Sequence, residues 1–207
     1  MARTRASAKQ AGTRFETQCA EYLTDQLGVK ITRMPKSGAR DKGDLYGVTI
    51  HGVPLVVECK SPGRTSSWSL SGWWNETLEE TCHADTDYGI LVIKRFNTSV
   101  SKSFCVVDDT MWERLGADKY FTPQALKSVP NSTWGKHIDT HGVCSIKRHG
   151  KPGFWVVCSL EDMSKIIHNE RKVTQITLPE DLVTQLMDKG EIITTDDAGG
   201  DVRITTS

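Results

Sequence analysis

Two charged residues interrupt an apolar run between residues 55 and 60, and this run constrains the fold more than any other segment. It reads Leu-Val-Val and continues with Glu58, Cys59 and Lys60. Side chains alternate between the two faces of a strand, so Glu58 and Lys60 share one face while Cys59 points to the other. A buried carboxylate is costly unless a cation compensates it. The run is therefore predicted to be a strand whose one face carries charged groups.

A second carboxylate lies a short distance before this strand. Asp44 precedes an apolar stretch at residues 45–50, and residues 51–54, His-Gly-Val-Pro, are typical of a hairpin connection. The strands that carry Asp44 and Glu58 are therefore expected to be antiparallel neighbours, about 4.8 Å apart. That spacing suits the bridging of both carboxylates by one divalent cation, with Lys60 offsetting their charge or steering a water molecule.

These residue types match the needs of phosphodiester hydrolysis. The reaction requires an activated water, relief of charge on phosphorus and a stabilised leaving oxygen, which carboxylate-held cations and a lysine can provide. Asp44, Glu58 and Lys60 are therefore interpreted as a metal-dependent phosphodiesterase site. Two alternatives stay open: the three residues form a surface ion-pair cluster, or Asp41 takes the place of Asp44.

Hydrophobic periodicity predicts an α/β order of elements. The first predicted helix begins at a Thr13 cap and ends at Gly28. The strand at 89–96 should run parallel to the Glu58 strand, because a helix joins them. The predicted helices are 12–28, 69–84, 111–115, 160–171 and 182–187, and the predicted strands are 29–34, 44–48, 48–50, 55–58, 89–96, 103–107, 143–147 and 154–158, with mainly loop at 117–140 and a polar, disordered end at 194–207.

Charge and composition divide the chain and limit its setting. Residues 1–64 hold 11 Lys and Arg against 6 Asp and Glu, so this part is expected to meet an anion. No apolar run approaches the roughly 20 residues that span a bilayer, and the basic start lacks the apolar segment of a secretion signal. We therefore predict no membrane insertion and a cytoplasmic location, the host cytoplasm if the protein is phage-encoded.

Several other residue types have a structural and a functional interpretation. The six scattered cysteines indicate buried thiols, with a zinc site of His141, Cys144, His149 and Cys158 as the alternative. Trp73 and Trp74 fit the apolar stripe of a helix and are predicted to be core residues, while the role of Trp68 stays open. Lys147, Arg148 and Lys151 surround the tip of the predicted hairpin and are candidates for a second DNA contact.

The order of elements resembles the PD-(D/E)XK nuclease superfamily over about residues 10–108. The resemblance is carried by Phe15-Glu16, by the run from Arg33 to Gly38, by Gly43-Asp44-Leu45 and by Val57-Glu58-Cys59-Lys60. It is closest to archaeal-type Holliday junction resolvases and their phage relatives. The strict Pro-Asp dipeptide is absent, because Gly43 takes the proline position.

The resemblance implies a restriction-endonuclease-like core of helix, three-strand antiparallel meander, helix and strand, with a mixed central sheet and a C-terminal α+β extension. We accordingly divide the chain into a nuclease core at 1–108 and an extension at 109–178, whose role is a dimer interface or a DNA contact. Residues 179–207 form an acidic, partly disordered tail.

The resemblance also implies roles for individual residues. Asp44, Glu58 and the backbone carbonyl of Cys59 would ligate Mg²⁺, for which Mn²⁺ could substitute, with Glu16 completing a metal or water position. Lys60 would orient or deprotonate the attacking water, so Glu16, Asp44, Glu58 and Lys60 form the expected catalytic set. The expected DNA contacts are Arg33, Lys36, Ser37, Gly38, Arg40, Lys42 and Arg64, and the candidates on the second helix are Asn75, Glu76 and Glu80.

The expected activity is that of a metal-dependent DNA endonuclease that cleaves branched DNA in recombination or phage genome processing. A homodimer is expected, because symmetric cleavage of a four-way junction needs two active sites. The alternatives are a restriction-type, flap or single-strand nuclease with the same site, and a non-catalytic DNA-binding module.

Overall fold

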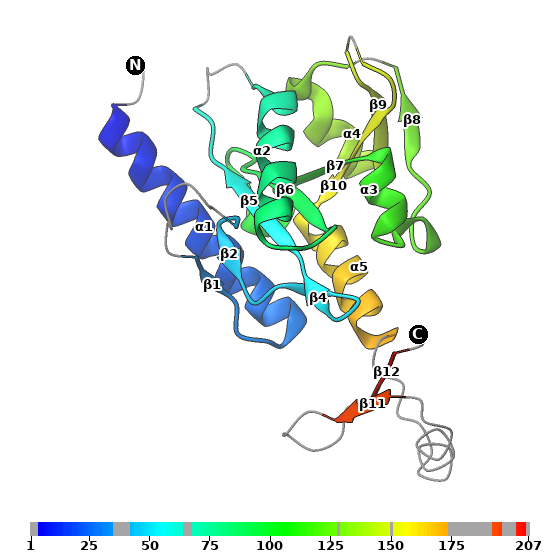
Figure 1. Cartoon of the computed structure of the whole chain (residues 1–207). Coiled ribbons are helices and arrows are strands. Elements are labelled where there is room, and N and C mark those ends of the chain that lie inside the picture. Colours follow the sequence, from blue (N-terminus) through cyan, green and yellow to red (C-terminus); the bar gives the residue numbers. More distant parts are fainter. Residues whose placement is uncertain are drawn as a thin grey trace.

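A six-stranded mixed sheet lies at the centre of the computed structural model (Figure 1). The structure describes residues 4–34, 42–63, 68–127, 129–149, 151–173, 192–195 and 202–205. The strands follow in the spatial order β5 (Val56–Lys60), β6 (Gly89–Ile93), β7 (Phe104–Asp108), β10 (Phe154–Ser159), β9 (Cys144–Lys147) and β8 (Gln124–Leu126). β5 pairs in parallel with β6, as does β8 with β9, and the other neighbours are antiparallel. The predicted mixed central sheet is confirmed.

Helices cover both faces of this sheet. α1 (Arg5–Leu27) and α5 (Leu160–Val173) contact each other on one face, where α1 packs on β5 and α5 on β7 and β10. α2 (Leu70–His83) forms the crossover from β5 to β6 and packs on both strands from the other face. The prediction of parallel strands joined by a helix is therefore confirmed.

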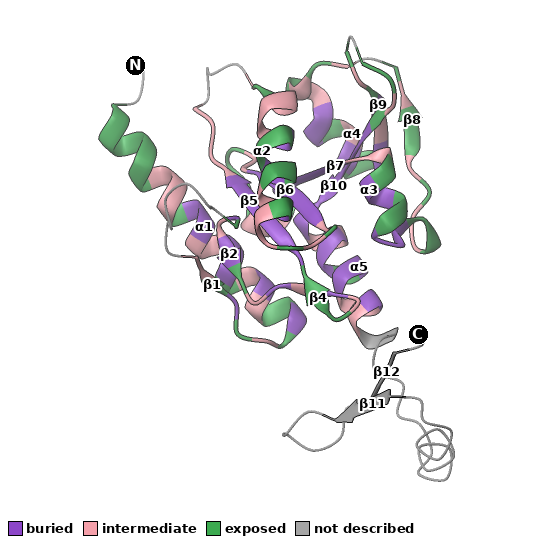
Figure 2. Ribbon diagram, in the orientation of Figure 1, coloured by how far each residue is buried: buried purple, intermediate pink, exposed green. Residues whose placement is uncertain are grey.

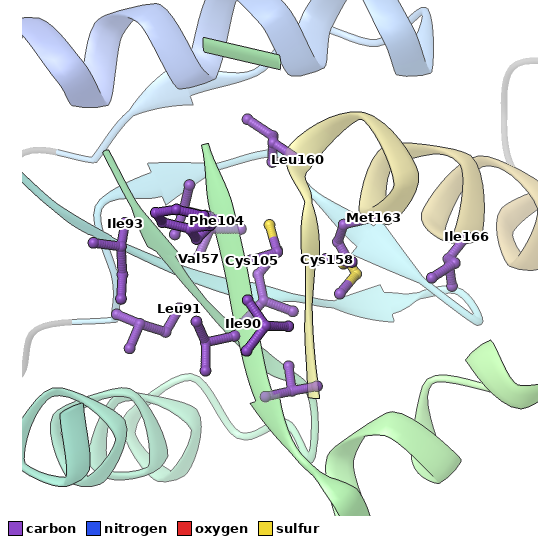
Figure 3. Close-up of a cluster of buried hydrophobic side chains, with 14 of the residues drawn as sticks. Val57, Ile90, Leu91, Ile93, Phe104, Cys105, Cys158, Leu160, Met163 and Ile166 are labelled. Carbon is purple, nitrogen blue, oxygen red and sulfur yellow. The ribbon is translucent and has the colours of Figure 1, made fainter. Parts of the chain in front are cut away.

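The core is built from strands that are apolar on both sides. All five residues of β6 are buried, as expected for a strand covered by helices on each face. Figure 3 shows Ile90 and Leu91 of this strand beside Cys105 of β7, with Met163 of α5 nearby. In Figure 2 the buried residues concentrate on the sheet and the helix sides that face it, whereas the N-terminal half of α1 is exposed.

The first helix begins earlier than predicted. Thr4, and not Thr13, is its N-cap: the Thr4 hydroxyl accepts a hydrogen bond from the Ser7 backbone N–H at 3.2 Å. The apolar stripe starts only at Phe15, so periodicity gave no signal for the preceding turns. The predicted end is confirmed, because Gly28 adopts a left-handed φ of 67°.

The three-strand antiparallel meander is confirmed only in part. β1 (Thr32–Arg33) pairs with β2 (Leu45–Tyr46), and β3 (Thr49–Ile50) with β4 (Val53–Pro54), both antiparallel and in two separate sheets. The expected regular ladder between the Asp44 and Glu58 strands is absent from the described pairings.

Single backbone hydrogen bonds hold this segment against β5. The Asp44 N–H donates to the Val57 carbonyl at 3.0 Å, and the Leu55 N–H donates to the Val48 carbonyl at 3.0 Å. Gly47 lies between these contacts with a φ of 96°, which breaks the extended backbone that a continuous ladder needs. The two carboxylate-bearing segments are nevertheless neighbours.

The prediction of a loop over residues 117–140 is wrong. This stretch contains β8, α4 (Trp134–His141) and two short 3₁₀ helices at Ala117–Lys119 and Asn131–Thr133. α4 spans only two turns, and β8 pairs along one side with β9, so neither element has a periodic pattern long enough to stand out in sequence.

Aromatic packing holds α4 on the sheet. Trp134 is buried and packs edge-on against Trp68 at 5.7 Å and Phe104 at 6.1 Å between ring centroids. Trp68, whose role the sequence left open, also contacts the half-buried Trp73 at 6.1 Å. Trp74 is buried, so the prediction of a core role for the pair on α2 is confirmed.

Most of the later predictions agree with the structure. The predicted hairpin is the β9–β10 pair, α5 matches the predicted helix at 160–171, and α3 (Asp109–Arg114) matches the one at 111–115. The predicted helix at 182–187 lies outside the described residues. In the predicted disordered end the structure describes two short strands, β11 (Ile192–Thr195) and β12 (Val202–Thr205), which pair antiparallel.

The second half of the chain contributes directly to the central sheet. β10 pairs with β7, and β9 and β8 continue the sheet from there. The segment after residue 108 thus shares one sheet with the segment before it. Within the described residues, no helix is both long and apolar enough to cross a membrane.

Candidate active site

Asp44, Glu58 and Lys60 meet toward the C-terminal end of β5. Glu58 is buried, with 7% of its surface exposed, and Lys60 Nζ donates to Glu58 Oε1 at 2.5 Å. Asp44 Oδ2 accepts the Cys59 backbone N–H at 2.9 Å, and the Asp44 and Glu58 side chains share a hydrogen bond. The Cys59 thiol points to the opposite face, against Cys19 of α1. The predicted alternation is confirmed, and a burial this deep argues against a surface ion-pair cluster.

Gly43 explains why the chain departs from a Pro-Asp dipeptide before the first carboxylate. Its φ is 95°, a value that proline cannot adopt. A Cβ atom at this position would also lie 3.0 Å from Val56 Cγ1 and 3.3 Å from the Val57 carbonyl oxygen. Glycine therefore lets the backbone pass close to β5 and deliver Asp44 beside Glu58.

The two carboxyl groups are held where both cannot easily be charged. Burial raises the pKa of Asp44 to about 8, and the charge of Glu58 adds to the shift. Burial also raises the pKa of Glu58, although Lys60 opposes the shift. Two adjacent carboxyl groups that are costly to ionise form an environment that a divalent cation would stabilise.

Lys60 bridges the two sides of the site. In addition to Glu58, its ammonium contacts Glu76 Oε2 of α2 at 2.6 Å. Burial alone would lower the pKa of Lys60, but the charges and hydrogen bonds of Glu58 and Glu76 outweigh it and raise that pKa. Lys60 is therefore held as an ammonium between two carboxylates.

Two acids of α2 belong to this site. Besides Glu76, which holds Lys60, the charge of Glu80 acts on Glu58 and contributes to its raised pKa. Both were candidates from the sequence, but so was Asn75, which is exposed. Glu76 and Glu80 lie one helical turn apart and both act on the site, whereas the described interactions include no contact of Asn75 with it.

Glu16 reaches the site from α1. It is buried, with 8% of its surface exposed, and its charge acts on Asp44. Its carboxylate also accepts two hydrogen-bonding contacts from Arg33, with Nε and Nη2 both at 2.8 Å from Oε2. Arg33 therefore neutralises Glu16 in this structure, and a DNA contact by Arg33 would compete with that pair.

The other predicted DNA contacts lie largely outside the described residues. This applies to Lys36, Ser37, Gly38, Arg40 and Arg64, and also to Asp41, the alternative to Asp44. Lys42 is described and exposed, immediately before Gly43.

The basic hairpin tip is only partly available as a second DNA contact. Arg148 is packed inward: its guanidinium lies 4.3 Å from the centroid of the Trp155 ring and 3.7 Å from Asp108. Lys147 and Lys151 are exposed. The Arg148 candidate is thus better explained by packing of the β9–β10 hairpin against α3 and β7.

The described residues contain no group of three or more His, Cys, Asp or Glu side chains placed to hold a metal ion. The alternative zinc site is therefore not assembled, since Cys144 and Cys158 are buried while His141 and His149 are exposed. At the candidate active site the donors are the carboxyl pair of Asp44 and Glu58. Hard oxygen donors of this kind fit Mg²⁺ or Mn²⁺, which retain water ligands and need few protein side chains.

A family model described as phage putative PDDEXK endonuclease matches residues 7–135, which is more than half of the chain. The matched segment contains Glu16, Asp44, Glu58, Lys60 and both acids of α2. Comparisons with curated proteins and with solved structures gave no match. The family match and the mixed α/β fold agree with each other, and the chain belongs to this family of phage PDDEXK endonucleases.

Proposed function

We propose that the chain is a metal-dependent DNA endonuclease that hydrolyses phosphodiester bonds, with branched DNA as its preferred substrate. One observation carries the proposal: Asp44, Glu58 and Lys60 converge toward the end of β5, where burial raises the pKa values of both acids. This arrangement is unfavourable without a cation and is suited to charge stabilisation on a phosphate.

Each residue has a role in this proposal. Asp44 and Glu58 would hold Mg²⁺ or Mn²⁺, assisted by the Cys59 carbonyl and, after release from Arg33, by Glu16. The cation supplies charge stabilisation at the phosphate and acidifies a water molecule. Lys60 would orient that water as an ammonium, since its two carboxylate partners favour the charged form.

The preference for branched DNA rests on the resemblance to Holliday junction resolvases. A resolvase would act as a homodimer, because paired nicks on a four-way junction need two sites related by two-fold symmetry. A role in recombination or phage genome processing belongs to the same proposal. The second candidate is a restriction-type, flap or single-strand nuclease, which would use the same site on another DNA.

Cleavage of matched DNA substrates tests the proposal. Four-way junction, flap, single-stranded and linear duplex DNAs of identical sequence are incubated with the protein in Mg²⁺ or in EDTA. We expect paired nicks near the crossover of the junction in Mg²⁺ and no cleavage in EDTA. Light scattering of the protein with and without the junction gives the number of subunits.

Glu58→Gln and Glu79→Gln serve as the matched variants. Glu79 is exposed on α2, and the same charge change there should leave cleavage intact, whereas Glu58→Gln should abolish it. Equal cleavage of linear or flap DNA would favour the second candidate. DNA binding without cleavage under any metal condition would favour a non-catalytic binding module, and full activity of Glu58→Gln would refute the assigned site.

A further inference from the structure

α1 is longer than its packing on the core requires. The helix begins at Arg5, but its first buried residue is Phe15. Figure 2 shows the N-terminal half of α1 as an exposed segment that projects past the sheet. An isolated helical extension gains little stability from packing, so it needs another explanation.

Contacts along α1 show where this extension points. Cys19 lies against Cys59 of β5, and one turn earlier the Phe15 ring lies 5.5 Å from the ammonium of Lys94. Lys94 follows β6 directly, and its backbone N–H donates to the Lys60 carbonyl. Toward its N-terminus, α1 therefore passes the C-terminal ends of β5 and β6. The exposed turns lie beyond the strand end that carries the catalytic lysine.

The face of α1 that packs on the core continues into these turns as a basic face. At 3.6 residues per turn, Arg5, Lys9 and Gly12 lie within about 40° of Glu16 around the helix axis. Glu16 and Leu23 belong to the buried stripe. Arg5 and Lys9 therefore face the same side as the catalytic acid, and Gly12 places no side chain between them and Glu16.

The charge of this face lacks compensation within the described residues. Arg5 and Lys9 are exposed, and no described side chain forms an ion pair with either. The first turn of α1 contains no acidic residue. Two cations near the positive end of a helix dipole are unfavourable for the isolated helix. A polyanion beside this face would outweigh this unfavourable interaction, because it would pair with both cations.

We propose that Arg5 and Lys9 form a phosphate-binding face for one arm of the DNA substrate, outside the catalytic site. This inference rests on the proposed nuclease function. The helical rise places Lys9 about 10 Å and Arg5 about 16 Å along the axis from Glu16. At about 3.4 Å per nucleotide of one strand, these residues would contact phosphates about three and five nucleotides from the cleaved bond.

A charge-matched pair of variants tests the face. Arg5→Gln/Lys9→Gln removes both cations, and Arg14→Gln/Lys30→Gln removes the same charge elsewhere. Arg14 lies about 160° from Glu16 around α1, and Lys30 follows the helix; both are exposed. We expect the first variant to raise KM about tenfold with little change in kcat, because its contacts lie away from the reacting atoms.

Salt and substrate length give further readouts. The slope of log KM against log salt should decrease by about two for Arg5→Gln/Lys9→Gln and not for the control variant. Shortening one DNA arm to fewer than three nucleotides should bring the wild type to the KM of the variant. The inference is overturned if the KM, the salt slope and the dependence on arm length of Arg5→Gln/Lys9→Gln match those of the wild type. It is also overturned if Arg14→Gln/Lys30→Gln changes these quantities equally.

Direct binding separates this inference from the proposed activity. Fluorescence anisotropy with the same DNAs in EDTA requires no cleavage. If no DNA is cleaved by the wild type but Arg5→Gln/Lys9→Gln alone weakens binding, the nuclease proposal fails and the binding face stands. If both variants bind like the wild type, the binding face is refuted whatever the cleavage result. Circular dichroism verifies that the variants keep the helix content of the wild type.

Discussion

At the scale of one residue, Asp44 shows that the proposed site lowers the stability of the fold. Its carboxyl group contacts that of Glu58 while Gly43 holds the backbone close to β5. Either carboxylate would be more stable in water, and their proximity adds repulsion. Without a bound metal ion, Asp44 stays protonated up to a pH of about 8, which limits the repulsion between the carboxyl groups of Asp44 and Glu58.

Asp44→Asn should stabilise the metal-free protein while abolishing cleavage. The folded-state pKa of Asp44 is raised from 3.8 to about 8, so its protonated form stabilises the fold at low pH. This stability is lost as pH rises from about 4 to about 8, because only the unfolded chain releases the proton readily. Asparagine keeps the acceptor for the Cys59 N–H without the charge.

Thermal unfolding in EDTA between pH 5 and pH 9 tests this expectation. The advantage of the variant over the wild type should grow as pH rises from 5 to 9 and reach at least on the order of 1 kcal/mol at pH 9. The same change at an exposed acid, Asp25→Asn, provides the control. A variant less stable than the wild type at pH 9 would show that the carboxylate is not strained.

Glu76 should act as a positioning residue for Lys60. In the structure Lys60 is shared between Glu58 and Glu76. A cation on Glu58 would weaken its hold on Lys60, so Glu76 would become the main anchor. Glu76→Gln should lower kcat about tenfold with little change in KM for DNA, because misplacement of one catalytic group affects the chemical step.

Two further variants distinguish positioning from a general effect of charge. Glu76→Asp keeps a carboxylate one methylene shorter and should recover part of kcat. Glu79→Gln removes a neighbouring exposed acid and should leave kcat unchanged. Steady-state kinetics on the DNA that the wild type cleaves best gives both parameters. Equal kcat for Glu76→Gln and wild type would exclude the positioning role.

At the scale of elements, Trp134 provides the aromatic contact of α4 with the sheet. Trp134 is buried and packs on Trp68 and Phe104, while its indole N–H has no hydrogen-bond partner among the described residues. Trp134→Ala should therefore destabilise the protein by about 3 to 5 kcal/mol. Trp134→Phe keeps ring packing and removes only an unsatisfied donor, so its cost should be much smaller.

Urea unfolding of the two Trp134 variants measures these costs. Phe154→Ala, which truncates a partly exposed ring, is the control and should change stability little. The cleavage pattern of folded Trp134→Phe should match that of the wild type, since Trp134 contacts none of the proposed catalytic residues in the described interactions. A small effect of Trp134→Ala would mean that α4 contributes little to the fold.

The same element marks the limit of prediction from sequence. α2 and α5 were predicted because burial of one helix face imposes a repeating pattern, and β6 because it forms a continuous apolar run. The two-turn α4 and the edge strand β8 depend on contacts with distant residues, which no local pattern records. The exposed start of α1 was missed for the complementary reason: it has no apolar stripe.

The candidate site was more predictable than the elements around it. Alternation along β5 placed Glu58 and Lys60 together, and a short connection placed Asp44 beside them. The sequence could not rank Glu76 and Glu80 against Asn75, because their selection depends on how α2 is rotated against the sheet. The pairing of Glu16 with Arg33 likewise depends on the packing of α1.

At the scale of the whole molecule, the site joins segments that are separate in sequence. α1, the Asp44 segment, β5 and α2 each contribute an acid, and repulsion between these acids opposes folding of the metal-free chain. A cation that binds only the folded state would relieve this repulsion. Metal binding should therefore be visible as stability of the entire protein, independently of cleavage.

Mg²⁺ should raise the melting temperature in a saturable manner. At a free concentration ten times the Kd, the stabilisation is about 1.4 kcal/mol, which corresponds to about 3 to 6 °C for a chain of this size. Glu58→Gln should lose most of this shift, whereas Glu79→Gln should keep it. Thermal unfolding with Mg²⁺, compared with NaCl at equal ionic strength, measures the difference. The same Mg²⁺ shift in Glu58→Gln and wild type would place the cation elsewhere on the molecule, because removal of one of two carboxylate donors must weaken a site built on that pair.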